Sequence, residues 1–220
     1  MQLFAVRPKN KIKRRGAKIA LYTAAFDIRE MRRHNSSFSG FCNNDCELKK
    51  DVCKEECNSK GELGRLLYLW RQSGYLIRYF KNQQTILSER YGLDVKSAIK
   101  RHNLLLDQVE EALLRRDLSS FFIPLYNDTP RGKVFHPELK FKSHYYYEDF
   151  ENWIRFYAVK YVDEETQTKN YIITGGSIKL VGNMADYAPI EYEEKKQNMV
   201  IQYLIEQKIT TRDKIEKVII

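Results

Sequence analysis

Four cysteines lie close together in the N-terminal third of the chain, and they carry the clearest chemical potential in the sequence. Cys42, Cys46, Cys53 and Cys57 follow the spacing C-x3-C-x6-C-x3-C, and the 220 residues contain no other cysteine. Within each C-x3-C pair the two side chains share one face of a helix, and the central x6 segment leaves room for a turn. The spacing therefore predicts a helical hairpin on which the four thiols meet.

Three interpretations fit such a hairpin. Four thiolates can bind a structural zinc ion, which suits a reducing compartment. Two disulfides can staple the helices in an oxidising compartment, and reduced cysteines can also simply pack against a neighbouring element. Since no secretory signal is recognisable, we expect reduced thiols, with or without zinc, and a cytoplasmic location.

Basic residues are in excess. Lys and Arg number 38 against 29 Asp and Glu, for a formal net charge of +9. The excess begins in residues 1–18, where Arg14, Arg15 and other basic residues precede the first acid, Asp27. Such a run is typical of a flexible arm, which either contacts nucleic-acid phosphates or is merely solvated. No apolar run reaches the roughly 20 residues of a membrane-spanning helix, so we expect no integral membrane segment.

The elements that must position these groups follow from the apolar pattern. Leucines and aromatic residues at helical spacing predict helices over residues 63–91 and 95–113, the second capped by Asp94. Residues 153–161 predict a strand, with Ile154 and Phe156 on one side and Arg155 and Tyr157 on the other, and residues 171–181 predict the return strand. Within the return strand, Gly175-Gly176 indicates a bulge or a close backbone approach.

A helix that begins at Pro189 follows the strands. Helices that precede a small antiparallel β-meander, with a closing C-terminal helix, are typical of the α+β class, which we therefore predict. We expect a basic arm over residues 1–18, a helical cysteine-containing module over 19–92, and an α+β module with the antiparallel sheet over 93–220.

The two predicted strands resemble those of the RelE/ParE/HigB toxin superfamily, especially its HigB-like branch. The likeness rests on Ile154-Arg155-Phe156-Tyr157 and on Gly176-Ser177-Ile178-Lys179, and it covers residues 95–208. Proteins of this superfamily are compact α+β microbial toxins, either RNA endonucleases that are often ribosome-dependent or relatives that act on gyrase. Each is held inactive by an antitoxin. The resemblance implies RNA or the ribosome, and an acidic antitoxin-like protein, as partners.

The resemblance also implies roles for individual residues. Arg155 would stabilise the charged phosphate of the transition state, Lys179 would supply a second cation, and Tyr157 would stack on a base or transfer a proton. Lys140 and Lys142 are candidate nucleic-acid contacts in the preceding segment. An enzyme of this kind would be an endoribonuclease that needs no metal for catalysis.

A second hypothesis involves no catalysis. The chain would then be an accessory protein that binds nucleic acid or a protein partner through its basic arm and cysteine hairpin. Arg155 and Lys179 would be ordinary solvent-side residues of an antiparallel pair. The two hypotheses differ in whether Arg155, Tyr157, Lys179 and Lys140 converge on one face of the sheet.

Overall fold

The computed structural model describes residues 2–5, 20–25, 61–115, 118–125, 136–143, 152–165, 167, 169–180 and 189–209. The strands are β1 (Gln2–Ala5), β2 (Ala20–Ala25), β3 (Phe122–Pro124), β4 (Lys140–Ser143), β5 (Ile154–Val162) and β6 (Lys169–Ile178). The helices are α3 (Gly61–Leu69), α4 (Ser73–Asn82), α5 (Gln84–Tyr91), α6 (Val95–Arg115), α7 (Leu118–Phe121), the 3-10 turn η1 (Pro137–Leu139) and α8 (Pro189–Glu206). The predicted α+β class is confirmed.

A single mixed sheet has the order β1-β2-β6-β5-β4-β3. Strands β3 to β6 form an antiparallel meander, as predicted, whereas β2 pairs with β6 in parallel and β1 pairs with β2 antiparallel. The apolar run around residues 20–25 fits either a strand or a helix start, because short apolar runs do not separate the two by periodicity. Pairing with β6 makes it a strand.

The β5–β6 pair contains the bulge that the glycine pair predicts. Tyr157 opposes Gly175 and Ala158 opposes Ile173, so Thr174 is the extra residue. The Thr174 hydroxyl donates a hydrogen bond to the Tyr157 carbonyl oxygen at 3.3 Å. This side-chain bond ties the bulged residue to the opposite strand.

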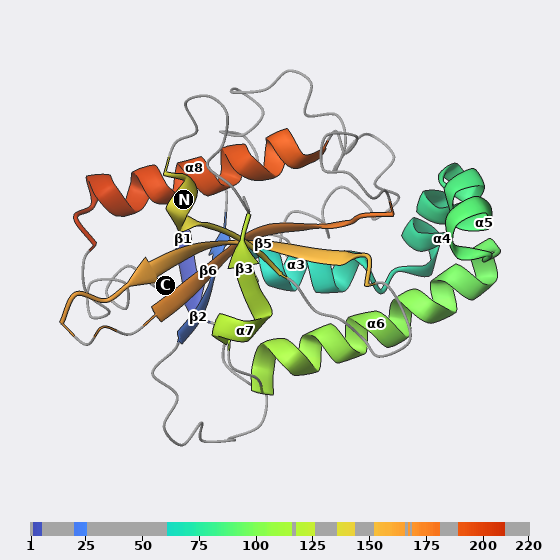
Figure 1. Ribbon diagram of the computed structural model, residues 1–220, viewed down its shortest axis with the longest axis horizontal. Helices are drawn as coiled ribbons and strands as arrows, with labels where there is room; N and C mark the ends of the chain where they lie inside the picture. The colour runs from blue at the N-terminus through green and yellow to red at the C-terminus, as the bar shows by residue number, and fades with distance from the viewer. Residues whose placement is uncertain are drawn as a thin grey trace.

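Helices cover both faces of the sheet (Figure 1). On one face α8 packs Val200 and Leu204 against Val159 and Ile172. On the other face α3, α4 and α6 enclose the larger apolar core, which contains Phe156. The alternation predicted for residues 153–161 therefore holds within β5, whose successive side chains enter different cores.

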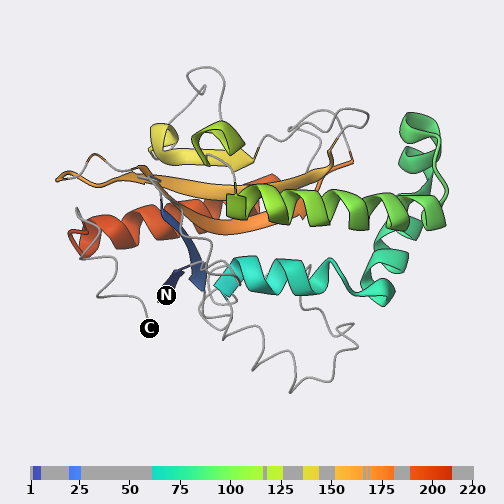
Figure 2. The same cartoon turned by 90° about the horizontal axis from the view of Figure 1, so that it is seen from below.

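The helical region is divided more finely than the sequence indicates. The single helix predicted over residues 63–91 is instead three: α3 ends at Leu69, α4 runs from Ser73 to Asn82, and α5 follows from Gln84. Helices α4 and α5 lie beyond the end of the sheet, where α6 begins (Figure 2). Asp94 caps α6 as predicted, because its Oδ1 accepts a hydrogen bond from the Ser97 N–H at 2.7 Å.

One hydrophobic core includes residues from both sides of residue 92. Leu66 and Phe80 come from the earlier helices, and Leu105 and Phe156 come from α6 and β5. Within the described ranges, no helix combines the length and the apolar character needed to cross a membrane.

Candidate functional site

The antiparallel meander brings the residues predicted in the sheet to one face. The register opposes Lys142 to Tyr157, and Arg155 to Ser177. Directly opposed residues of antiparallel strands point to the same side of a sheet. Arg155 and Tyr157 also share a side with each other, because they are two positions apart in β5.

Lys179 and Lys140 lie on this side as well. Lys179 follows Ser177 by two positions, and its N–H donates to the Trp153 carbonyl oxygen at 2.7 Å, which continues the β5–β6 pairing. Lys140 opposes Val159, which packs against α8. All the residues predicted in the sheet are therefore on the face that α8 covers.

The cations on this face differ in exposure. Lys142, Arg155 and Lys179 are partly exposed, whereas the Lys140 residue is only 1% exposed. Burial, together with the charge of Arg155, lowers the pKa of Lys142 below its ordinary value. The Arg155 guanidinium donates to the carbonyl oxygen of Asn152, which holds the side chain along the start of β5.

Tyr157 is enclosed. The residue is 0% exposed, and its hydroxyl lies 3.3 Å from Ser177 Oγ. Burial raises the pKa of Tyr157 to about 12, so the phenol is protonated at neutral pH. A ring in this position has no free face on which a base could stack.

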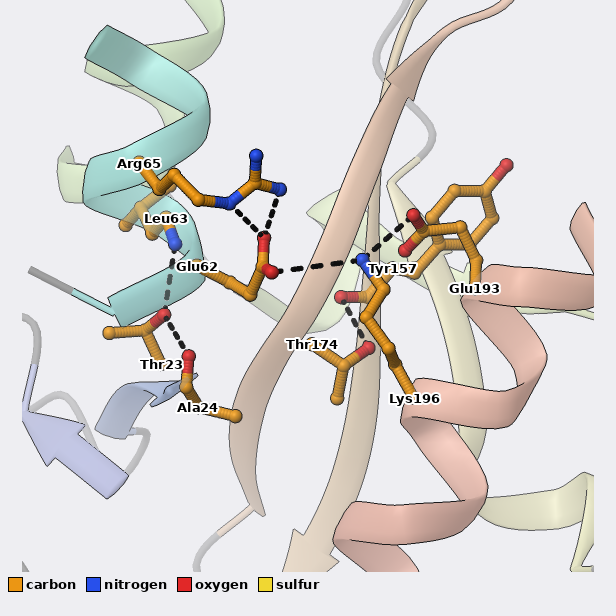
Figure 3. Close-up of polar contacts among 9 residues, drawn as sticks. All are labelled: Thr23, Ala24, Glu62, Leu63, Arg65, Tyr157, Thr174, Glu193 and Lys196. Atoms are coloured by element: carbon orange, nitrogen blue, oxygen red, sulfur yellow. Dashed lines mark hydrogen bonds and ion pairs between the residues drawn. The ribbon is translucent and has the colours of Figure 1, made fainter. Parts of the chain in front are cut away.

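Next to Tyr157 lies a set of charged residues that we call the buried ionic cluster: Glu62, Arg65, Glu193 and Lys196 (Figure 3). Lys196 Nζ is 2.8 Å from Glu193 Oε1 and 4.0 Å from Glu62 Oε1. Arg65 Nη2 donates to Glu62 Oε2 at 2.6 Å. The side chains of Glu193 and Lys196 are each 1% exposed, so water does not screen this pair.

The glycine pair in β6 makes room for the cluster. A Cβ atom on Gly175 would overlap Glu193 Oε2 and Lys196 Nζ from α8. A Cβ atom on Gly176 would lie only 2.8 Å from a ring carbon of Trp70, beside α3 on the opposite face. The close backbone approach that the sequence indicates therefore occurs on both sides of the strand.

Strand β2 fixes the position of Glu62. The Leu63 N–H donates to Thr23 Oγ1 at 3.0 Å (Figure 3), so the hydroxyl of β2 caps the first turn of α3. Gly61 begins the helix with φ +62°, and a Cβ atom there would lie 2.6 Å from Thr23 Cγ2. Glycine is required here both for the left-handed backbone and for the space.

The pKa values of the two glutamates in the cluster are shifted in opposite directions. Burial raises the pKa of Glu193 to about 7, although Lys196 opposes the shift. Burial would also raise the pKa of Glu62, but Arg65 and Lys196 together hold it below its ordinary value. Glu193 Oε2 is buried without a hydrogen-bond partner among the described residues. Glu62 is therefore ionised at neutral pH, whereas Glu193 changes its charge near that pH.

The chain was compared with protein-family models, with curated proteins and with solved structures, and none of them matches it. A function must therefore be inferred from the chemistry of the residues in this structure. Two groups on the α8-covered face offer such chemistry: the partly exposed cations at the beginning of β5 and the proton-binding carboxyl of Glu193.

The remaining predicted site residues lie outside the described residues. These are the four cysteines of the hairpin, Cys42, Cys46, Cys53 and Cys57, and the two arginines of the arm, Arg14 and Arg15. Within the part of the chain that the structure describes, no group of three His, Cys, Asp or Glu side chains is arranged to hold a metal ion. The zinc hairpin and the phosphate-binding arm stay predictions.

The buried ionic cluster was not predicted. Glu193 lies near the N-terminus of α8, where the helix dipole alone is a sufficient reason for an acidic residue. The helical phase of the apolar residues Val200 and Leu204, continued toward the N-terminus, reaches Lys196 and Glu193. That phase was the available signal that both side chains face the sheet.

Proposed function

We propose that the protein binds RNA through the cations Lys142, Arg155 and Lys179, which we call the cationic face. The observation that carries the proposal is their origin in three adjacent chain segments that share one side of the sheet. Positive side chains at neighbouring positions are suited to follow a phosphate backbone. The net charge of +9 adds a general attraction for polyanions.

Helix α8 supports the same assignment by its direction. It runs antiparallel to β6, because Glu193 lies over Gly175 while Leu204 packs with Ile172. The N-terminal end of α8, with its positive dipole, therefore points toward the cationic face. Cations and a helix N-terminus that converge in this way favour an anionic ligand.

The activity to test is metal-independent RNA cleavage, as the resemblance to the RelE/ParE/HigB superfamily suggests. In such a reaction the ribose 2′-hydroxyl attacks the neighbouring phosphate, and Arg155 would stabilise the negative charge that develops there. An acidic antitoxin-like protein would bind the same cations and block them. Both expectations extend the RNA-binding proposal.

The experiment measures the affinity for a labelled single-stranded RNA at several salt concentrations. The double variant Arg155→Gln/Lys179→Gln is compared with Lys81→Gln/Lys96→Gln, which removes the same charge from exposed positions of α4 and α6. We expect about tenfold weaker binding and a smaller salt dependence for the first variant only. Equal losses in both variants would show that binding follows net charge, and would refute the cationic face.

A second candidate function is RNA binding without cleavage, as part of a larger assembly. The enclosed ring of Tyr157 favours it, because a buried phenol with a pKa of about 12 does not contact a substrate. Gel analysis of the RNA after incubation separates the two candidates. Intact RNA with salt-sensitive binding supports the accessory protein, and fragments with a 2′,3′-cyclic phosphate end support the nuclease.

A further inference from the structure

The two halves of α8 bury different kinds of side chain against the sheet. In the C-terminal half, Val200, Ile201 and Leu204 are buried in an apolar core. Among residues 192–196 of the N-terminal half, only the charged residues Glu193 and Lys196 are buried. Tyr192 is partly buried against the same core, so residues 192–196 combine an apolar contact with a buried charged pair that the C-terminal half lacks.

Gln197 marks the boundary between the halves. Its side-chain amide nitrogen lies 3.0 Å from the carbonyl oxygens of Phe141 and of Ala158, and donates to both. These bonds tie the middle of the helix to β4 and β5. The turns before Gln197 contain the buried charged pair, and the turns after it contain the buried apolar residues.

The N-terminal half of α8 lies over the residue that the resemblance selects as a site tyrosine. Glu193 occupies the space above Gly175, which opposes Tyr157. Burial dominates the raised pKa of Tyr157, and the negative charge of Glu193 contributes to it. The ring is thus enclosed beneath a helix segment that buries a titratable pair, Glu193 and Lys196.

We propose that α8 is a proton-controlled cover: protonated Glu193 keeps its N-terminal half on the sheet, and ionisation of Glu193 releases that half and uncovers Tyr157. The charged groups that face Glu193 are Glu62 and Arg65 from α3 and Lys196 from α8 itself. Tyr157 faces it from β5, and β6 contributes only the backbone of Gly175.

The physical reason is the environment of the second carboxyl oxygen. Glu193 Oε2 is buried and has no hydrogen-bond donor among the described residues. Ionisation places negative charge there while Lys196 is already shared with Glu62, and a buried charge without a full set of partners is unfavourable. Burial raises the pKa of Glu193 to about 7, so the closed form is favoured below this pH and is lost as the pH rises through it.

The consequence for RNA rests on the proposed function, because only there does an uncovered Tyr157 have a base to contact. The movement of the helix does not rest on it. The test below contains no RNA, so a protein that fails to bind RNA would leave this test unaffected.

Hydrogen exchange of the full chain, read by mass spectrometry at pH 6 and pH 8 and corrected for intrinsic rates, tests the cover. We expect protection of residues 192–197 to fall by about tenfold or more in the wild type, with residues 200–206 unchanged. Glu193→Gln should keep its protection at both pH values. Glu206→Gln, an exposed glutamate of the same helix, is the control and should behave like the wild type.

Equal protection of residues 192–197 at the two pH values in the wild type would overturn the proposal. The same loss of protection in Glu193→Gln would overturn it as well. Should Glu193→Gln fail to fold, the wild-type profile over intermediate pH values decides. A one-proton transition with a midpoint near pH 7, confined to residues 192–197, supports the cover, and a loss spread over all of α8 refutes it.

Discussion

Lys196 of α8 lies within 4.0 Å of Glu62 of α3, although the two helices pack against opposite faces of the sheet. A Cβ atom on Gly175 of β6 would overlap Lys196 Nζ, so the missing side chain leaves room for the ammonium group at this position. The buried ionic cluster thus joins the two helical layers.

Replacing the shared cation should destabilise the fold. In Lys196→Met the buried Glu193 carboxyl loses its 2.8 Å partner and Glu62 keeps only Arg65, and removing one partner of a buried ion pair costs about 3–5 kcal/mol. Urea denaturation measures the free energy of unfolding. Lys195→Met, at the exposed neighbouring position, should change it by less than about 0.5 kcal/mol. An unchanged free energy of unfolding in Lys196→Met would show that Lys196 adds nothing to stability.

The substitution Gly175→Ala should displace the ion pair of Glu193 and Lys196. The added Cβ overlaps Glu193 Oε2 and Lys196 Nζ, and overpacking of this kind costs about 1–3 kcal/mol. Gly74→Ala is the matched control, because a Cβ atom there meets nothing within 4 Å. In the first turn of α4 that substitution should stabilise the protein by up to about 1 kcal/mol. Thermal unfolding of both variants would reveal the contrast, and equal effects would contradict it.

The pH dependence of stability should change when Glu193 is neutralised. The pKa of Glu193 is raised from 4.5 to about 7, so the native state binds this proton more tightly than the unfolded state does. Its stabilising effect is complete below the unfolded pKa and is lost as the pH rises through 7. Relative to Glu193→Gln, the wild type should therefore lose on the order of 3 kcal/mol between pH 4.5 and pH 7.5. Parallel unfolding curves for the two proteins would exclude this titration.

His102 should produce the opposite slope in the acid range. It is buried beside Trp153, whose Nε1–H donates to His102 Nδ1 at 3.2 Å, and burial lowers the pKa of His102 to about 4. The stability it contributes is present above pH 6.5 and is lost as the pH falls toward 4. His102→Phe should remove this part of the acid sensitivity, while the loss of the hydrogen bond costs about 1 kcal/mol at neutral pH. Tryptophan fluorescence measures the acid sensitivity during acid unfolding and the cost at neutral pH during urea unfolding. The same dependence of stability on pH below 6.5 in the wild type and in His102→Phe would contradict the prediction.

Local patterns predicted the local structure well. The alternation around Phe156, the Asp94 cap and the bulge beside Gly175 each depend on residues within a few positions of one another, and each is confirmed. Features that join distant segments were missed. The pairing of β2 with β6 and the contact of Glu62 with Lys196 each join residues far apart in the sequence. Hydrophobic periodicity reports only on nearby residues, so it does not indicate either contact.

The candidate site shows the same limit. The register that places Arg155 and Lys142 on one face follows from strand alternation and hairpin pairing, which the sequence indicates. The enclosure of Tyr157 depends on α8, which joins the sheet from a later part of the chain. Tyr157 can therefore be fully buried on the same side of β5 as the partly exposed Arg155, because a helix covers part of that side.

The parallel pairing of β2 with β6 also has a consequence for how the chain folds. Its register pairs Ala20 with Asn170. The β2–β6 pair therefore cannot form until most of the polypeptide has left the ribosome. The meander and its helices can assemble from contacts that are nearer in sequence, whereas closing this large loop is slow. During synthesis β1 can pair with one edge of β2, but the edge that later meets β6 has no partner, and it is the kind of exposed edge that chaperones protect from aggregation.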